Sequence, residues 1–493
     1  MRGSAQAIVL IAGVLAWVAY VHRPLDYRIR SPWRQADYTG IARSFAREGM
    51  DVLYPRIDWR GAGPGYVEGE FPLVPWMGAL LLRAFGDRPW LLRLPPLACA
   101  IASLLVFLGL ARRLLPPAGV LLATAAFAAN PLLFHLATAI QPDALMVLLA
   151  LVAAGACWRW GDRPESTTRL FVAAAAIAGA ILAKAPAAYL GFVLAWEVLR
   201  REGLRGALRP RVPLAAAVAL GPPVAWYAWA YHFWTGYGNS LGLSNGDHFL
   251  TLAMLAPPRF LVGILKWETL GVLTPFGWVL AAAAVAGGLR PIERPLVWYL
   301  AVWIFYVVAA KTTSADWAYY YHASTVAPAC LLMGGGLAAI AEGRALPRRW
   351  AWVGPALGAA TVVALVALVG VYVRLRDGRD DLRPMWECSR AFARFVPPTG
   401  LLVVAGSSDE GYGWTGAYNV SMPFAWMDRR GFNYPENRLG IETLDRIAAR
   451  GGRWWMASRA ELDHDHLRDL VDRKYRLVAS CEGEYFLYDL APR

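Results

Sequence analysis

Apolar runs long enough to span a bilayer recur along this chain, separated by short polar connections. A helix needs about 20 apolar residues to cross the hydrocarbon core. The first run, residues 4–21, is followed by no small-residue cleavage site, so we expect a retained helix with its N-terminus inside. The later runs are 94–114, 119–134, 144–158, 170–183, 187–199, 212–233, 260–289, 295–310, 324–341 and 350–373. The pattern predicts a polytopic α-helical membrane protein of about 11 spans.

Composition supports this interpretation and removes two others. Of the 493 residues, 57% are hydrophobic and 17% are charged, which is too apolar for a soluble protein of this length. A formal net charge of +13 suggests a nucleic-acid partner at first sight. The basic residues lie in the connections between apolar runs, however, and not on one soluble face, so we expect no nucleic acid.

Arginine is concentrated in alternate connections. The arginine-rich ones are 111–113, 159–163, 200–211, 289–294 and 344–349. The positive-inside rule assigns them to the cytoplasm. The first loop (22–93), the connections that carry Asp143 and Lys184, and the chain after residue 374 then face outward. We therefore expect a multi-pass protein of the inner (plasma) membrane whose polar loops face the periplasm or the outside.

One apolar helix, Leu73–Phe85, does not fit this alternation. It is too short to span a bilayer comfortably, and the charge pattern leaves it no transmembrane position. We expect a re-entrant or interfacial helix on the outer side. A short true span is the alternative, and it would reverse the orientation of everything before Arg112.

The last part of the chain, residues 375–493, differs from the transmembrane domain (1–374) in its pattern of hydrophobic and polar residues. Strand-like runs at 401–405, 454–457, 476–480 and 484–490 alternate with helix-like runs at 389–396, 442–451 and 460–475. This alternation predicts a small α/β domain on the outer side of the membrane. Cys388 and Cys481 lie within it and could pair in an oxidising compartment, a question that the sequence leaves open.

The first outer loop carries the leading catalytic candidates. Arg34 and Asp37 share one face of an expected amphipathic helix, where the carboxylate is positioned to act as a general base. A surface ion pair or a helix cap in a solvated loop is the alternative for Asp37. Glu70 stands before Phe71 and Pro72 at the start of the short helix. It is a second candidate acid, with compensation of the helix dipole as the alternative.

A second group of candidates comes from later outer connections. Asp143 opens a membrane helix as a catalytic candidate or as an N-terminal cap. Lys184 lies between two apolar runs, and a lysine there needs an anion, for which a lipid phosphate is the natural choice; snorkelling to the headgroups is the alternative. Lys311, Tyr320 and His322 are expected as further phosphate or sugar contacts, with an aromatic membrane-interface belt as the alternative for the tyrosine.

No metal centre is expected. The five cysteines show no zinc or redox spacing, and His464-Asp465-His466 lies in a charged helix, where such histidines are usually solvated. No cofactor is required by any motif, although participation of a divalent cation stays open.

The order of short motifs resembles the GT-C membrane glycosyltransferases of family 39, which include the protein O-mannosyltransferases and the lipid A aminoarabinose transferases. The motifs are Arg34-Gln-Ala-Asp37-Tyr38, Ile41-Ala-Arg43, Tyr54-Pro55, Glu68-Gly-Glu70-Phe71-Pro72, Ala111-Arg-Arg-Leu114 and Ala139-Ile-Gln-Pro-Asp143. The resemblance covers about the first 200 residues well and the region around Tyr319–Pro328 loosely. It implies a sugar donor carried on a polyprenyl phosphate, transfer with inversion on the outer face, and Asp37 as the base.

By the same resemblance, Asp143 and Glu70 match the other acidic positions and Lys184 matches the residue that faces the lipid phosphate. The chain also departs from the family. Phe71 stands where the aminoarabinose transferases have lysine, which points to a different sugar or acceptor. We find no large soluble β-domain like that of the mannosyltransferases, which argues against a protein acceptor of the eukaryotic kind.

The sequence thus favours an inverting glycosyltransferase that moves a monosaccharide from a polyprenyl-phosphate donor to a lipid, glycan or protein acceptor. Two rivals remain. A transporter or flippase of lipid-linked sugars would be expected to show inverted repeats with broken midplane helices, and neither is visible in the sequence. A non-catalytic sensor would not require so many spans.

Overall fold

The structure is a computed structural model. It describes residues 32–243, 257–288, 292–308, 311–377, 381–406, 421–464 and 467–491. The chain forms two compact units, each assembled from separated segments. The membrane unit comprises Met1–Arg23, Pro96–Trp226 and Gly246–Arg374, and the loop–tail unit comprises Pro24–Pro95, Tyr227–Asn245 and Leu375–Arg493. Each unit is considered on its own below.

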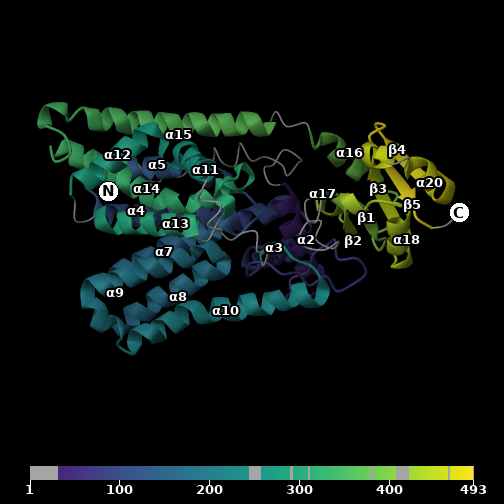
Figure 1. Ribbon diagram of the computed structural model, residues 1–493, viewed down its shortest axis with the longest axis horizontal. Coiled ribbons are helices and arrows are strands. Elements are labelled where there is room, and N and C mark those ends of the chain that lie inside the picture. Colours follow the sequence, from purple (N-terminus) through teal and green to yellow (C-terminus); the bar gives the residue numbers. More distant parts are fainter. Residues whose placement is uncertain are drawn as a thin grey trace. The chain divides into compact units, whose positions relative to one another are not determined.

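Helices account for the membrane unit (Figure 1). They are α4 (Leu94–Leu114), α5 (Pro117–Ala128), α6 (Pro131–Leu136), α7 (Asp143–Asp162), α8 (Thr167–Ala183), α9 (Leu190–Ala207), α10 (Arg211–Tyr237), α11 (Arg259–Trp267), α12 (Thr274–Ala286), α13 (Glu293–Val308), α14 (Ala323–Ala341) and α15 (Val353–Asp377). Each later apolar run of the sequence therefore contains at least one helix. The first run, residues 4–21, lies outside the described residues.

Six helical segments of the described chain are long and apolar enough to cross a membrane. They are Pro89–Leu114, Asp143–Asp162, Arg211–Tyr237, Arg259–Ala286, Tyr319–Ala341 and Arg348–Leu375. Large apolar side chains on α15, such as Val363 and Val366, are exposed, as expected of a surface that faces lipid. The structure shows a multi-pass membrane protein, whereas the expected number of about 11 spans stays a prediction.

Two apolar runs are interrupted. The run 119–134 breaks at Asn130, whose side chain accepts hydrogen bonds from the N–H groups of Leu132 and Leu133, while Pro131 opens α6. Both features start a new helix. The run 260–289 is broken by a π-helix, Glu268–Leu273, between α11 and α12.

α14 is the central helix of the membrane unit and is buried along nearly its whole length. A Cβ atom on Gly334 would lie 2.5 Å from Gly119 O of α5, and one on Gly336 would lie 1.8 Å from Leu280 O of α12. Only glycine permits this approach. The Gly334–Gly336 run therefore allows close packing of α14 against α5 and α12.

Three of the arginine-rich connections, 111–113, 159–163 and 289–294, meet at one end of the membrane unit. Asp162 pairs with Arg113 and, at 2.9 Å, with Arg294, and Arg294 also pairs with Glu197 at 2.7 Å. α7 has 20 residues, so its first residue, Asp143, lies about 30 Å from this cluster. These three connections therefore lie at the opposite end of α7 from Asp143, and the expected orientation of the chain stays a prediction.

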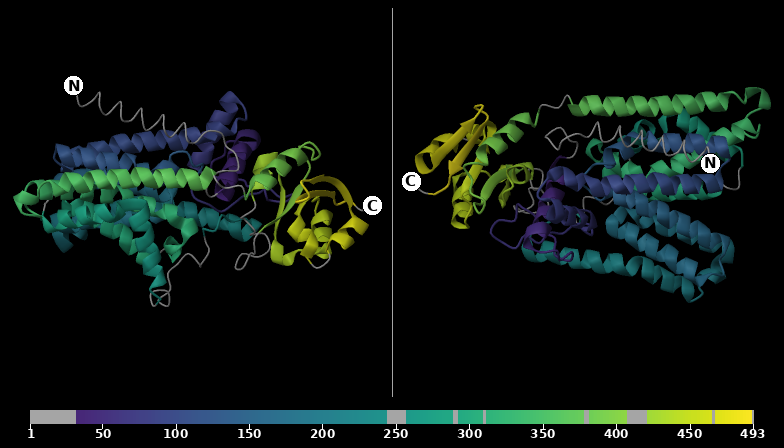
Figure 2. Two further views of the ribbon diagram at one scale, coloured as in Figure 1. Left: turned by 90° about the horizontal axis from the view of Figure 1, so that it is seen from above. Right: turned by 180° about the vertical axis from the view of Figure 1, so that it is seen from behind.

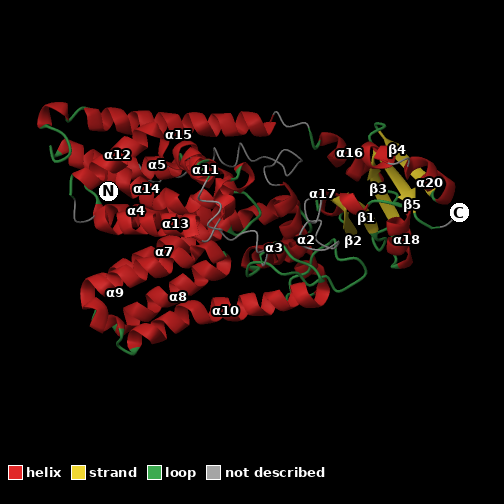
Figure 3. Cartoon of the chain, in the orientation of Figure 1, coloured by secondary structure: helices red, strands yellow, loops and turns green. Residues whose placement is uncertain are grey.

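The tail folds into an α/β domain with a five-stranded sheet (Figure 3). Its strands are β1 (Leu402–Gly406), β2 (Gly431–Pro435), β3 (Trp454–Ser458), β4 (Arg476–Cys481) and β5 (Tyr485–Asp489), in the order β2-β1-β3-β5-β4. β1 pairs parallel with β2 and β3, and β5 pairs antiparallel with β3 and β4. Four strands were expected from the sequence, and β2 was not.

Helices cover both faces of this sheet. Leu444 and Ile447 of α18 (Ile441–Ala449) and Val471 of α20 (Leu467–Lys474) pack on the face that carries Trp455. On the opposite face, α16 (Arg383–Phe392) contacts β4 and β5. A disulfide joins Cys388 of α16 to Cys481 of β4, which answers the question of pairing left open by the sequence.

The first loop and the tail belong to one unit, which sequence analysis did not anticipate. The loop supplies α2 (Pro32–Glu48) and α3 (Leu73–Phe85), which pack on each other. α17 (Met422–Met427) of the tail packs on α2, and the N–H of Gly61 donates to Gly431 O of β2 at 2.6 Å. Figure 2 shows α2 and α3 in purple and the tail from green to yellow. The loop is thus part of a folded body.

Candidate functional site

Asp37 is buried in the N-terminal half of α2. Its side chain is 1% exposed, and α2 is buried from Arg34 to Phe45, polar residues included. Asp37 Oδ1 accepts a hydrogen bond from Trp59 Nε1 at 3.0 Å, whereas the buried Oδ2 has no hydrogen-bond partner among the described residues. A solvated surface pair, the alternative weighed from the sequence, is therefore not what the structure shows.

Burial raises the pKa of Asp37 to about 7. Removal from water disfavours the charged carboxylate, and the Trp59 hydrogen bond, the positive charge of Arg34 and the nearby Ser421 hydroxyl compensate only in part. Arg34 itself is buried and donates to Leu241 O at 3.2 Å. A carboxyl group that titrates near neutral pH and keeps one oxygen unbonded is suited to take up a proton.

Asp58 is a second carboxylate beside Asp37 that was not among the candidate residues. A Cβ on Gly40 would lie 2.2 Å from Asp58 Oδ2, so the carboxylate packs directly on the backbone of α2. Burial, opposed by the charge of Arg43, raises the pKa of Asp58 to about 6, and its negative charge contributes to the raised pKa of Asp37. Gly40, one helical turn after Asp37, was the only indication in the sequence of this contact, since a residue without a side chain leaves room for the Asp58 carboxylate.

Glu70 lies in the same unit as Asp37. Its carboxylate is buried and accepts a hydrogen bond from the Tyr38 hydroxyl at 2.7 Å. α3 begins at Leu73 and has no acidic residue in its first turn, so Glu70 does not take the position expected for dipole compensation. Tyr38 follows Asp37 in α2, and the contact ties Glu70 to the catalytic candidate.

The C-terminal end of α2 is held by ion pairs. Arg47 pairs with Asp428 at 2.8 Å, and Arg43 pairs with Asp87 at 3.1 Å and donates to Ala425 O at 2.7 Å. Asp428 and Ala425 belong to the tail. These contacts, together with the packing of α17, fix the position of α2 within the unit.

The membrane unit carries the second group of candidates. Lys184 Nζ lies 2.6 Å from Asp143 Oδ1, and both side chains are almost completely buried. The ammonium group also lies 4.7 Å from the ring centre of Tyr320 and 4.8 Å from that of Tyr321. The anion that sequence analysis sought for Lys184 is thus present in the protein, and neither snorkelling of the lysine nor capping by the Asp143 side chain is observed.

Gln141 stands two residues before Asp143 and is 1% exposed. Neither amide atom of its side chain has a hydrogen-bond partner within the described chain. Buried amides are rarely left in this state, and such a group is commonly completed by a water or a ligand. Gln141 therefore marks polar binding capacity next to the Lys184–Asp143 pair.

His322 has protein partners on both ring nitrogens. Nδ1 lies 2.8 Å from Glu268 Oε1, and Nε2 lies 2.9 Å from Thr313 O. Thr313 O can only accept, so Nε2–H donates to it, and Nδ1 faces the Glu268 carboxyl group. The Tyr299 hydroxyl donates to Glu268 at 2.8 Å.

Glu268 was not among the candidate residues, although a carboxylate inside an apolar run indicates a possible functional site. It opens the π-helix, an element that is often found at functional sites. The expected role of His322 as a phosphate contact stays a prediction. The side chain of Lys311, which starts a 3₁₀ turn (Lys311–Ser314), is not among those that the structure describes.

The structure groups the candidates into two sets. Asp37, Arg34 and Glu70 lie in the loop–tail unit, and Asp143, Lys184, Tyr320 and His322 lie in the membrane unit. Among the described residues, no group of three or more His, Cys, Asp or Glu side chains could hold a metal ion. Asp465 and His466 of the histidine pair lie outside the described residues.

Part of the chain matches a family model. Residues 69–229 match the model of the dolichyl-phosphate-mannose-protein mannosyltransferase family. The match covers about a third of the chain and includes Glu70, Asp143 and Lys184. A search of the curated proteins finds no match.

Solved structures are similar over nearly the whole chain. ArnT from Cupriavidus metallidurans in the apo state has a TM-score of 0.65 at 15% identity, covering 100% of this chain and 99% of that one. The same protein bound to undecaprenyl phosphate has a TM-score of 0.64 at 16% identity, covering 99% and 98%. The archaeal oligosaccharyltransferase AglB from Archaeoglobus fulgidus, in complex with an inhibitory peptide and a dolichol-phosphate, has a TM-score of 0.55 at 12% identity, covering 97% and 74%. The chain has the GT-C fold of these membrane glycosyltransferases, and the resemblance expected from its sequence is confirmed.

Proposed function

We propose that the protein is an inverting glycosyltransferase that moves a monosaccharide from a polyprenyl-phosphate donor to a lipid, glycan or protein acceptor on the outer face of the membrane. The observation that carries the proposal is the state of Asp37, a buried carboxyl group with one unbonded oxygen and a pKa raised to about 7. The neighbouring folds support the donor class, since ArnT is bound to undecaprenyl phosphate and AglB to a dolichol-phosphate in their structures.

In the proposed reaction, Asp37 is the general base. An acceptor hydroxyl lies against Oδ2 and loses its proton to the carboxylate as its oxygen attacks the anomeric carbon of the donor sugar. The bond between that carbon and the phosphate oxygen breaks on the opposite face, and its electron pair leaves with the polyprenyl phosphate. The new glycosidic bond then has the inverted configuration. Trp59 and Arg34 keep the Asp37 side chain oriented, and Glu70 fixes the turn that follows through Tyr38.

The leaving group gains negative charge, and a fixed cation stabilises it. Lys184 is the leading candidate because its ammonium group is held rigidly by Asp143 and two tyrosine rings. The unpaired amide of Gln141 offers a further donor for the phosphate or the sugar. We also propose Arg34, Lys311 and His322 as phosphate contacts. Both ring nitrogens of His322 have protein partners, so a contact with the phosphate would have to replace one of these partners.

The transfer reaction can be tested with purified protein in nanodiscs and a sugar-labelled polyprenyl-phosphate donor. Addition of a membrane glycolipid extract is expected to release unlabelled polyprenyl phosphate in step with label incorporated into an acceptor. A flippase would move the donor across a vesicle bilayer without releasing the carrier lipid. Movement without release would therefore favour the transporter and contradict the proposed function.

The pH dependence of this reaction follows from Asp37. The carboxylate is the active form of the base, and its pKa is raised to about 7. We therefore expect kcat/KM to rise about tenfold per pH unit below pH 7 and to level off above it. The measurement is a pH profile of carrier release between pH 5 and 9.

The control for this profile is Asp58→Asn. It removes a negative charge that raises the pKa of Asp37 and is expected to shift the midpoint to lower pH. A profile that is flat from pH 5 to pH 8 in the wild-type protein would contradict the assignment of Asp37 as the base.

A further inference from the structure

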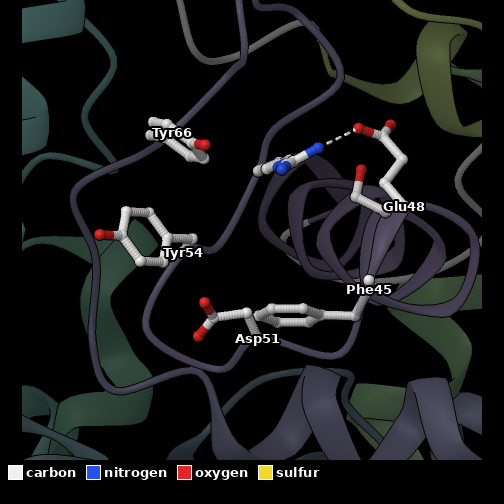
Figure 4. A pocket seen from close by; sticks show the side chains of 8 residues that line it. Phe45, Glu48, Asp51, Tyr54 and Tyr66 are labelled. Atoms are coloured by element: carbon white, nitrogen blue, oxygen red, sulfur yellow. Dashed lines mark hydrogen bonds and ion pairs between the residues drawn. The ribbon is translucent and has the colours of Figure 1, made fainter.

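A small pocket lies at the C-terminal end of α2, within the loop–tail unit (Figure 4). Its volume is about 170 Å³. It is lined by Ser44, Phe45, Glu48, Gly49, Asp51, Tyr54, Arg56 and Tyr66. Nothing in the proposed reaction uses these residues.

Aromatic rings form much of the wall. In Figure 4, Tyr54 and Tyr66 lie on one side of the space, and Phe45 and Glu48 lie on the other. The Tyr54 and Tyr66 rings are 5.1 Å apart, and both pack on Phe233 of α10, at 5.8 and 5.5 Å. The contacts with Phe233 therefore hold the Tyr54 and Tyr66 rings in place. An aromatic face is electron-rich and attracts the weakly positive C–H groups that cover one face of a sugar ring.

The polar groups of the pocket leave one carboxylate available. Glu48 is neutralised by Arg56 at 2.6 Å and by Arg60 at 2.7 Å. Asp51 is exposed, and within the described chain its side chain accepts one hydrogen bond, from the N–H of Leu53 at 3.1 Å. A carboxylate with unused acceptor capacity beside aromatic rings can bind neighbouring hydroxyl groups. It also repels a second negative charge.

The size and position of the pocket restrict its occupant. A cavity of about 170 Å³ holds on the order of ten water-sized groups, which corresponds to one sugar ring and not to a lipid chain. Phe45 and Glu48 follow Asp37 in α2 by eight and eleven positions, which places them about 12–17 Å along the helix. This distance exceeds the reach of a single monosaccharide whose hydroxyl contacts Asp37.

We propose that this pocket binds one neutral or amino-sugar ring of the acceptor, beyond the ring that carries the reacting hydroxyl. The proposal rests on the proposed function, because it assigns the site to the acceptor of that reaction. It makes the acceptor a glycan or glycolipid of at least two sugar residues.

The test is direct binding without any donor. Full-length protein in nanodiscs is titrated with methyl glycosides of glucose, galactose, mannose, arabinose, glucosamine and glucuronic acid, and binding is read by ligand-observed NMR. The pocket variants are Asp51→Ala and Tyr66→Ala. The matched controls are Asp463→Ala, an exposed acid of the tail, and Tyr231→Ala, an exposed tyrosine of α10 that does not line the pocket.

At least one neutral or amino glycoside is expected to bind the wild-type protein and both controls, and the glucuronide is expected to bind more weakly than the glucoside. Asp51→Ala should lower the affinity roughly fivefold or more, the fold-change of one hydrogen bond. Tyr66→Ala should lower it roughly tenfold through loss of stacking. Asp51 is exposed, so its variant is expected to keep the fold even where Tyr66→Ala does not.

Other results would overturn the proposal. They are failure of every glycoside to bind, equal binding by wild type and Asp51→Ala, and preference for the glucuronide. Affinity for a labelled polyprenyl-phosphate-sugar donor is measured in the same variants and is expected to be unchanged. A parallel loss of donor affinity would assign the pocket to the donor and overturn the proposal. Absence of transfer with intact glycoside binding would refute the proposed function alone.

Discussion

An Asp37→Asn variant is expected to lose sugar transfer by a factor of about 10²–10⁴ while becoming more stable than the wild-type protein at pH 8. The loss of activity follows because asparagine cannot accept the proton of the acceptor hydroxyl. The gain in stability follows from the burial of Asp37, since the folded protein holds a charged carboxylate away from water above pH 7.

The sign of the stability change is set by proton binding. The pKa of Asp37 is raised from 3.8 to about 7 in the folded protein, so between these values the folded state holds a proton that the unfolded state has lost. The free energy of unfolding of the wild-type protein therefore falls as pH rises from about 4 to 7. Ionisation of Asp37 lowers the free energy of unfolding of the wild-type protein by at most about 4 kcal/mol at pH 8. Asp37→Asn has no ionisable group at this position and does not lose this stability.

Thermal unfolding at pH 4 and pH 8, together with the carrier-release assay, measures both effects. The stability difference between variant and wild type should appear at pH 8 and vanish near pH 4, so the pH 4 measurement is an internal control. Asp463→Asn, an exposed acid, should match wild type in both assays. Retained transfer by Asp37→Asn would refute its role as the base, and destabilisation of Asp37→Asn at pH 8 would refute the raised pKa.

A Lys184→Met variant is expected to lose both donor affinity and stability. Removing the ammonium group leaves Asp143 buried without its counter-ion, which typically costs about 3–5 kcal/mol. The double variant Lys184→Met/Asp143→Leu removes both charges and is expected to recover most of that stability without recovering transfer. The double variant thereby separates the structural contribution of the pair from its proposed contact with the phosphate.

Lys266→Met is the matched control for this experiment. Lys266 pairs with Asp316 at 2.7 Å, but both side chains are exposed, so we expect a change below about 1 kcal/mol and no loss of donor binding. Stability is measured by thermal unfolding in nanodiscs and donor affinity with labelled lipid. Transfer at wild-type rate by the double variant would show that Lys184 has only a structural role.

Most of the helical architecture could be predicted from the apolar pattern, because a membrane helix is long and its signal is strong. The run 94–114 corresponds to α4, and the expected helix Leu73–Phe85 corresponds to α3. The interruption at Asn130 was missed because only two residues within an apolar run, the capping Asn130 and the following Pro131, cause it. β2 was missed because it is a short strand that begins at a glycine and ends at a proline.

The candidate site was predictable by residue type but not by partner. The charge alternation placed Asp143 and Lys184 at the same side of the membrane, yet their contact joins residues 41 positions apart in different helices. Trp59 and Asp58 contact α2 from a loop without periodicity, so no pattern related them to Asp37. Glu268 was not recognised as a candidate because the apolar run around it was interpreted only as a membrane helix.

The joint folding of the first loop and the tail has a consequence for biosynthesis. Residues near position 60 contact residues near position 431, and Arg43 contacts Ala425, so these contacts close loops of roughly 370–380 residues. Translation from the N-terminus therefore releases α2 long before α17 and β2 exist. The environment of Asp37 is completed only after nearly the whole chain has been synthesised and the tail has folded. Until then, the proposed general base does not have the surroundings described above.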